Sequence, residues 1–427
     1  MSRRARGAPD PRAVAPVTAT VIDPATAIAI DPTTGRAIPR TAVRRGRGGA
    51  HDAADRGHMA RCLTLAEQFR GRTAPNPIVG CVIVDRAGRV IAEGAHRGPG
   101  TDHGEADALR KLGGKAPGAT LYVNLEPCNH HGRTPPCAPA VRDAGVARVV
   151  IGIEDPIDGH GGGIELLRRA RIKVTTGVLA EDCARANRPF LTWSGFHRPA
   201  FTLKAAITLD GKIATVAGQS KWITGPAARD DVMRLRDTHD AVMVGIGTVL
   251  ADDPWLTARR QGGRNPVRVV VDSKLRTPPD AHVLAGRQGP RTIVACSKDA
   301  PAAREAALVA RGAEVWRIAS HRNGRLDLGV LARKLGNIGF TSVLVEGGGE
   351  VHAYMIEHGL ADEVLLYIAP KIVGGPAPSW VGGKGLASLT AAHRFVIDGD
   401  PIRLDGDLRL TLLPAPIAEP PPIDDPD

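Results

Sequence analysis

The sequence predicts an α/β protein with two domains, and three observations support this fold class. The length of 427 residues exceeds the usual size of a single domain. Short β-branched segments alternate with segments of helical apolar spacing, which is typical of a largely parallel sheet covered on both faces. This alternation runs to about residue 198 and then begins again at residue 201.

Both ends of the chain are expected to lie outside the domains. Residues 1–54 are rich in Ala, Pro, Arg and Thr and show no sustained period, so they bury too little apolar surface to offset the entropy lost on ordering. Residues 414–427 are Pro-rich and acidic. We therefore predict two disordered tails around domains at 55–198 and 199–413.

The first domain is expected to open with a helix at 59–69. A Pro-Asn-Pro turn at 75–77 then leads into a β-branched run, which predicts a strand. The remaining elements follow from the same periodicities: strands at 89–96, 120–125 and 148–153, helices at 103–112 and 138–146, a helix and a strand within 155–179, and a connecting helix at 180–193.

The second domain repeats this alternation. Strands are predicted at 201–208, 241–247, 267–272, 292–296, 313–318, 342–346 and 363–370. Helices are predicted at 225–238, 301–310 and 349–359, with another between 318 and 342.

Composition limits the class of protein. No run of about 18 apolar residues occurs and the N-terminus lacks an apolar signal core, so we expect a soluble cytoplasmic protein. The six scattered cysteines predict reduced thiols rather than a disulfide framework. The net charge is +11, but residues 1–50 alone carry nine Arg against three Asp, which indicates a basic tail rather than a nucleic-acid groove.

One short stretch carries the residues of a catalytic zinc site. His103, Cys128 and Cys137 are the imidazole and thiolate ligands that zinc prefers, and three protein ligands leave a position for water. The metal lowers the pKa of that water to about 7. Glu105 follows the first ligand by two residues and is expected to act as the acid/base that moves a proton to a leaving amine.

The spacing of the two cysteines is unusual. The common zinc-deaminase pattern is P-C-x-x-C, whereas eight residues separate Cys128 from Cys137 here. A longer loop is required, and Gly132, Pro135 and Pro136 can supply its turns. Taken singly, each residue is more typical of a buried thiol or an ordinary histidine. The combined order of residues favours zinc.

The second half contains two glycine-rich loops, at 245–248 and 347–349. Glycines between a strand and a helix let backbone N–H groups approach phosphate, but neither loop matches a dinucleotide-binding or P-loop pattern. Tight turns explain them equally well. Arg236 and Arg259 are candidates for gripping an anionic substrate, although a solvated arginine is the commoner case. The residues alone indicate a nucleotide- or phosphate-binding α/β domain.

Seven motifs together resemble the bifunctional riboflavin-biosynthesis deaminase/reductase family. They run in the family's order over about residues 56–413: PNPIVGCVIV (75–84), HGE (103–105), LEPCNHHGRTPPC (125–137), KAAITLDGKIA (204–214), SKWITG (220–225), VGIGTVLADDPWLT (244–257) and LVEGGG (344–349).

The resemblance implies a cytidine-deaminase-like three-layer domain followed by a dihydrofolate-reductase-like α/β domain. The first would use Zn²⁺ to deaminate 2,5-diamino-6-(5-phosphoribosylamino)pyrimidin-4(3H)-one. The second would use NADPH to reduce the ribosyl group of 5-amino-6-(5-phosphoribosylamino)uracil to ribityl. The expected partner is therefore a phosphorylated ribosylaminopyrimidine, with no nucleic acid or membrane, and we expect a homo-oligomer.

The resemblance also assigns residues in the second domain. Its NADP contacts fall on Ala206, Trp222, Thr248, Asp252, Ser273, Gly348, Gly349, Glu350, Val351, His352, Ala353 and Tyr354. Its substrate contacts fall on Ser220, Arg236, Leu256, Arg259 and Glu346. Four positions depart from the family pattern: Gly104 replaces the usual Ala, Ala95 the usual Trp, Asn129 the usual Ser, and Arg171 the Gly of a common AGI. The zinc ligands and Glu105 are intact, so deaminase activity is still expected.

Two other functions fit part of the pattern. An RNA or nucleobase deaminase would share the zinc and Glu105 but would not need the second domain. A non-catalytic zinc-binding scaffold would hold the metal without turnover, yet every ligand and proton-transfer group is present. Both are less favoured than the bifunctional enzyme.

Overall fold

The computed structural model describes residues 52–132, 134–157, 160–285 and 289–415, together with the strands β1 (Ala27–Ile30) and β2 (Ala37–Pro39). These two short strands pair in antiparallel fashion. The predicted tails at 1–54 and 414–427 lie mostly outside the described residues. In the described part of the chain, no helix is both long and apolar enough to cross a membrane.

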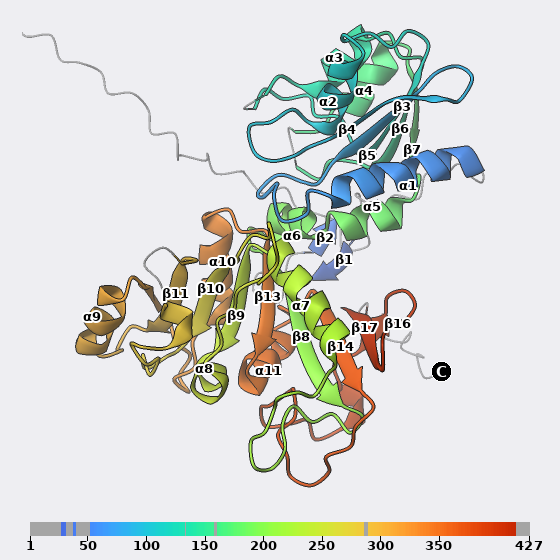
Figure 1. Ribbon diagram of the computed structural model, residues 1–427. Coiled ribbons are helices and arrows are strands. Elements are labelled where there is room, and N and C mark those ends of the chain that lie inside the picture. The colour runs from blue at the N-terminus through green and yellow to red at the C-terminus, as the bar shows by residue number, and fades with distance from the viewer. Residues whose placement is uncertain are drawn as a thin grey trace, which may run out of the picture.

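The N-terminal unit comprises the elements from α1 to α6, drawn from blue to green in Figure 1. Its helices are α1 (Ala53–Glu67), α2 (Gly104–Lys111), α3 (Cys137–Asp143), α4 (Gly163–Arg169), α5 (Ala180–Ala186) and α6 (Arg188–Phe196). Its strands are β3 (Gly80–Val84), β4 (Val90–Ala95), β5 (Thr120–Leu125), β6 (Arg148–Ile153) and β7 (Lys173–Thr176).

The sheet of this unit has the order β4-β3-β5-β6-β7 and is mixed. Strands β5, β6 and β7 are parallel, as expected, but β3 is antiparallel to both β4 and β5. The expectation of a largely parallel sheet is therefore wrong for this half of the sheet. The physical reason is the short turn at 85–89, which is too tight for the crossover that a parallel pair requires.

The C-terminal unit comprises the elements from β8 to β17, and Figure 1 shows it below the N-terminal unit. Its helices are α7 (Pro226–Thr238), α8 (Ile246–Asp252), α9 (Ala302–Ala310), α10 (Leu328–Asn337) and α11 (Gly349–Glu357), with 3₁₀ turns η3 (His282–Leu284) and η4 (Leu389–Ala391). Its strands are β8 (Ala200–Thr208), β9 (Ala241–Gly245), β10 (Val267–Val271), β11 (Thr292–Ser297), β12 (Glu314–Ile318), β13 (Ser342–Gly347), β14 (Glu363–Ala369), β15 (Phe395–Ile397), β16 (Ile402–Leu404) and β17 (Asp407–Pro414).

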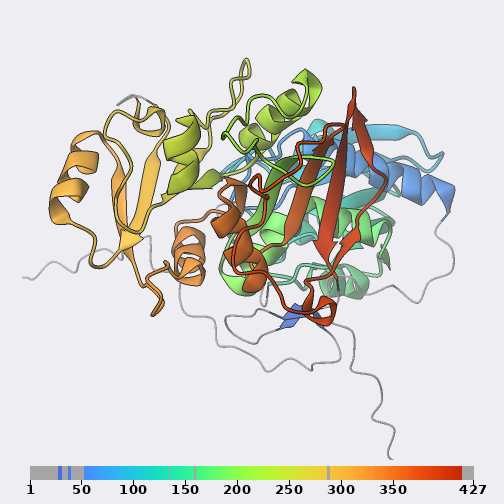
Figure 2. The same ribbon diagram turned by 90° about the horizontal axis from the view of Figure 1, so that it is seen from below.

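The sheet of the C-terminal unit has the order β12-β11-β10-β9-β13-β8-β14-β17-β15, with β16 also paired to β17. It runs in Figure 2 from the yellow strands to the red ones. The seven strands β12, β11, β10, β9, β13, β8 and β14 are parallel to their neighbours, and β17 is antiparallel to β14. The three antiparallel strands at the end, β15 to β17, were not predicted from the sequence.

Both faces of the C-terminal sheet are covered, as expected. Ala241 and Met243 of β9 belong to one buried cluster, whereas Val242 and Val244 belong to another. Successive residues of a strand point to opposite faces, so the two clusters are separate cores above and below the sheet. The loops that follow β9 and β13 emerge at the same edge, because the carboxyl ends of parallel strands lie together.

Candidate active sites

Three side chains that suit a metal ion meet in the N-terminal unit. His103 precedes α2, Cys128 follows β5, and Cys137 begins α3. The Nδ1 atom of His103 lies 3.5 Å from Sγ of Cys128 and 3.4 Å from Sγ of Cys137. Zinc bonds of about 2.0–2.3 Å in a tetrahedral arrangement place ligand atoms roughly 3.6 Å apart, so the observed separations fit this ion.

The electrostatics of the cluster also suit a cation. A hydrogen bond with the Cys137 thiol lowers the pKa of the Cys128 thiol to about 4, and the ring of His103 acts in the same direction. The backbone N–H of Cys137 also points at this sulfur, at 3.4 Å. One cysteine therefore carries a negative charge at neutral pH, which is the form that binds zinc.

Glu105 lies beside the cluster and is nearly inaccessible, with 3% of its surface exposed. Burial raises the pKa of its carboxyl to about 7, while the charge of the His103 imidazole opposes this shift. Among the described residues, its Oε2 atom has no hydrogen-bond partner. A buried carboxylate oxygen without a partner is costly, so the arrangement suits a group that receives a proton during a reaction.

The cluster faces a cavity of about 300 Å³. His96 lines this cavity and is held in place by Asn76, whose Nδ2 lies 3.1 Å from Nε2 of the ring. Phe190 and Trp193 of helix α6 form another part of the wall. The volume suits one small heterocycle rather than a nucleic-acid strand.

The loop between the two cysteines closes back on itself. Its last residue, Pro136, precedes α3, and the N–H of Ala138 donates to the carbonyl oxygen of Cys128 at 3.0 Å. This contact holds both sulfurs at one place despite their wide separation in sequence. The described part of the loop therefore brings Cys137 back to Cys128, as the wide spacing of the two ligands requires.

The glycine at position 104 has a packing reason. A Cβ atom added there would lie 3.1 Å from the carbonyl oxygen of Val79 and 3.2 Å from its Cγ1, which is tighter than most real Cβ contacts. Glycine therefore permits close approach of the start of α2 to the chain before β3.

The C-terminal unit holds a second cavity of about 370 Å³, near the ends of β8, β9 and β13. All five predicted substrate residues line it: Ser220, Arg236, Leu256, Arg259 and Glu346. Arg236 is buried and bound to protein: its Nη2 lies 2.8 Å from Oε2 of Glu346, and its Nη1 donates to the Thr257 carbonyl oxygen. Arg259, by contrast, makes no hydrogen bond or ion pair with any residue that the structure describes.

A third cavity of about 570 Å³ adjoins the second, and the two share Ile213, Ser220, Thr248, Asp252, Gly348 and Gly349. The predicted cofactor residues divide between them. Ala206, Trp222 and His352 line only the smaller cavity, and Ser273, Glu350, Val351 and Tyr354 line only the larger one. Ala353 lines neither cavity and is buried. Eleven of the twelve residues thus border one continuous space.

Lys204 also lines the smaller cavity, and sequence reasoning missed it. Its ammonium lies 5.6 Å from the centre of the Tyr367 ring and makes no hydrogen bond or ion pair within the described residues. Burial lowers its pKa, and the charge of Glu346 opposes that effect. One signal was present in the sequence: Lys204 is the single charged residue in the apolar strand β8.

Two family models match the chain in separate regions. The cytidine and deoxycytidylate deaminase zinc-binding region matches residues 53–153, and the RibD C-terminal domain matches residues 199–401. These matches fall on the units that carry the thiol–imidazole cluster and the adjoining cavities, respectively.

Relatives and solved structures cover most of the chain. The riboflavin biosynthesis protein RibD of Actinobacillus pleuropneumoniae is 41% identical, over 82% of this chain and 94% of its own. RibD of Escherichia coli is 40% identical, over 80% and 94%. The crystal structure of a Thermotoga maritima diaminohydroxyphosphoribosylaminopyrimidine deaminase/5-amino-6-(5-phosphoribosylamino)uracil reductase superposes with a TM-score of 0.74 at 37% identity, covering 85% of this chain and 99% of that one. This chain therefore belongs to the RibD family of bifunctional riboflavin-biosynthesis deaminase/reductases.

Proposed function

We propose that His103, Cys128 and Cys137 hold zinc and that Glu105 moves the proton in deamination of 2,5-diamino-6-(5-phosphoribosylamino)pyrimidin-4(3H)-one. The cavities around Glu346 and Gly348 would then bind the deaminated product and NADPH. The observation that supports the proposal best is the buried carboxylate with an unpaired oxygen beside three zinc-type ligand atoms.

The deamination step depends on Glu105. Zinc, when bound, makes hydroxide available near neutral pH for attack on the amidine carbon. Glu105 takes up the proton released by the water and passes it to the exocyclic nitrogen. The carbon–nitrogen bond then breaks, ammonia leaves, and a carbonyl remains. His96 and Asn76 border the same cavity, and the amide oxygen of Asn76 can accept a hydrogen bond from the pyrimidine, because its Nδ2 contacts His96.

The reduction step depends on the positively charged side chains that line the second cavity. NADPH, when bound, supplies a hydride to C1′ of the ribosyl group. The bond between C1′ and O4′ breaks, and its electron pair moves to the ring oxygen. Lys204 is suited to donate the proton that this oxygen needs, because its ammonium has no protein acceptor within the described residues. Arg259 is suited to the 5′-phosphate, while Arg236 keeps the Glu346 carboxylate in place.

The direct test supplies the phosphorylated diaminopyrimidinone together with NADPH and follows ammonia and the absorbance of NADPH in one reaction. We expect one ammonia released and one NADPH oxidised per substrate, with ammonia appearing first. Ammonia release from RNA or cytidine but none from this substrate would contradict the proposal.

Arg276 is expected to select NADPH over NADH. It lines the larger cavity beside Ser273 and makes no hydrogen bond or ion pair within the described residues, whereas the nearby Arg325 is bound to Glu350. We expect Arg276→Ala to raise the KM for NADPH about ten- to hundredfold, because a hydrogen bond to a charged group is worth roughly 1.5–3 kcal/mol.

The KM for NADH should not change in this variant, since NADH lacks the 2′-phosphate. Arg322→Ala removes an exposed arginine that borders neither cavity and serves as the matched control. An equal loss of affinity for both nucleotides would show that Arg276 does not contact the distinguishing phosphate.

We also propose domain limits of 55–198 and 199–413, because helix α6 ends at Phe196 and strand β8 begins at Ala200. Limited proteolysis tests whether cleavage falls near residue 198.

A cytoplasmic location is supported by the six free cysteines, and cell fractionation tests it. A homo-oligomer is supported by the exposed apolar residues on the last strands of the sheet, Ile397, Ile402 and Leu408. Light scattering measures the oligomeric state.

The small deaminase cavity supports a single-nucleotide substrate and no nucleic-acid partner. A binding assay with single-stranded RNA tests this.

A further inference from the structure

Helix α6 bridges the two units, and both of its ends contact the C-terminal unit. Figure 1 shows α6 between the N-terminal sheet and the strands below it. Arg188, at the start of the helix, forms an ion pair of 2.7 Å with Glu363 of β14. Trp193, in its last turn, donates its indole N–H to the carbonyl oxygen of Gly336 in α10 at 2.9 Å.

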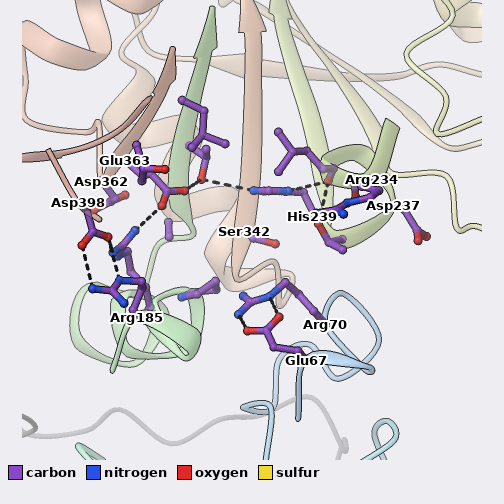
Figure 3. Close-up of a pocket in the computed structure, with 18 of the residues that line it drawn as sticks. Glu67, Arg70, Arg185, Arg234, Asp237, His239, Ser342, Asp362, Glu363 and Asp398 are labelled. Carbon is purple, nitrogen blue, oxygen red and sulfur yellow. Dashed lines mark hydrogen bonds and ion pairs between the residues drawn. The ribbon is translucent and has the colours of Figure 1, made fainter. Parts of the chain in front are cut away.

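Charge pairs on either side of α6 hold the units together. Arg198, just after the helix, makes two hydrogen bonds to Asp362, of 2.7 and 3.0 Å. Arg185, just before it, makes two bonds of 2.9 Å to Asp398. Figure 3 shows Arg185 and Asp398 bonded to each other in the wall of a cavity of about 730 Å³, which residues of both units line. The position of α6 is thus fixed by the C-terminal unit.

The same helix forms a wall of the deaminase cavity. Phe190 and Trp193 are three residues apart, so they share one face of α6, and both line the cavity that contains His103 and Glu105. Phe190 belongs to the hydrophobic core of the N-terminal unit. Trp193 is only partly buried, and it alone of the two also bonds to the C-terminal unit.

We propose that Trp193 is a specificity-determining residue of the deaminase, which positions the pyrimidine in the cavity and is itself oriented by the C-terminal unit through Gly336. An indole offers a flat apolar surface on which a heteroaromatic ring stacks. The deaminase cavity is then complete only when the second unit is docked. The inference rests on the deaminase site proposed above.

Gly336 makes this contact possible. A Cβ atom at position 336 would lie 2.3 Å from the carbonyl oxygen of His197 and 2.9 Å from Cα of Arg198, so any side chain forces the backbones apart. The closeness of α10 to the chain that follows α6 brings the Gly336 carbonyl within reach of the indole. A substitution at position 336, in the C-terminal unit, is therefore expected to alter the deaminase cavity of the N-terminal unit.

The test uses the full-length, zinc-loaded enzyme and measures kcat and KM for ammonia release from the phosphorylated diaminopyrimidinone. We expect Trp193→Ala to raise this KM about ten- to hundredfold, since stacking of a base on an aromatic side chain is commonly worth that much. Trp193→Phe keeps a ring but loses the bond to Gly336, so a smaller rise of a few fold is expected. Gly336→Ala should raise the KM in the same direction.

Gly195→Ala is the matched control on the same helix, because a Cβ atom there meets nothing within 4 Å. It should leave the KM unchanged. Zinc content and the reduction of the deaminated intermediate are measured for every variant and should match the parent enzyme. An unchanged deaminase KM in Trp193→Ala and Trp193→Phe overturns the proposal, as does an equal loss of both activities in all three variants. Absence of ammonia release from the parent enzyme would instead overturn the deaminase site itself.

Discussion

Replacing Glu105 with Gln is expected to reduce ammonia release by about 10²- to 10⁴-fold, the usual contribution of general acid–base catalysis. The amide has nearly the shape of the carboxylate but cannot take up and return a proton. The side chain is buried and its Oε2 has no partner among the described residues, so the substitution breaks no hydrogen bond there. Ammonia release by the purified variant measures the effect.

Zinc content and reductase activity distinguish a catalytic role for Glu105 from a structural one. The three ligand atoms come from His103, Cys128 and Cys137, so the variant should hold as much zinc as the parent. It should also oxidise NADPH normally when given the deaminated intermediate. Asp107→Asn is the control: Asp107 is a buried carboxylate on the same helix that faces Arg110 and Lys111 rather than the cavity. Equal ammonia release by Glu105→Gln and the parent would contradict the assigned role.

The metal cluster was predictable because its chemistry is local in sequence. The ligand types, their order and the acid/base residue all lie within 35 residues. What the sequence could not supply was how the eight-residue loop returns Cys137 to Cys128. That closure depends on a backbone hydrogen bond from Ala138 and on the placement of α3, which are tertiary features.

The alternation of strands and helices was also predictable, but the ends of both sheets were not. Strands β15 and β16 have three residues each and are largely exposed. Such short edge strands show neither a clear alternation nor an apolar run, and their pairing with β17 stabilises them. The antiparallel placement of β3 was missed for a related reason. Periodicity identifies a strand but not its direction.

Pairings between distant residues were the least predictable part of the sites. Arg236 and Glu346 were both expected to contact substrate, yet they are 110 residues apart in sequence and bind each other. Their pairing changes the interpretation of the cavity, because it leaves Arg259, Lys204 and Lys221 as its cations without a protein partner among the described residues. The contact between Trp193 and Gly336 was unpredictable for the same reason, because the two residues are 143 positions apart in sequence.

Replacing Lys204 with Met is expected to reduce the reductase rate at least about 100-fold, while deamination continues at the parental rate. Met fills a similar volume but carries no proton, and proton donation by a positioned group usually contributes 10²- to 10⁴-fold. The ammonium is tolerated in the protein because it lies near the face of the Tyr367 ring, whose hydroxyl donates to Asp231 at 2.7 Å. NADPH oxidation with the deaminated intermediate measures the effect.

The pH dependence of the reductase gives an independent readout of the same group. Burial lowers the pKa of Lys204 below its usual value, and a proton donor must be protonated to act. The parent rate should therefore fall as the pH rises through this lowered pKa. Lys204→Arg keeps the positive charge but should be nearly as slow as Lys204→Met at every pH, because a guanidinium does not give up its proton in a protein. Lys298→Met removes an exposed lysine of the same unit and should change neither rate nor profile. If Lys204→Met and Lys298→Met reduce the intermediate equally fast, the proton must come from another group.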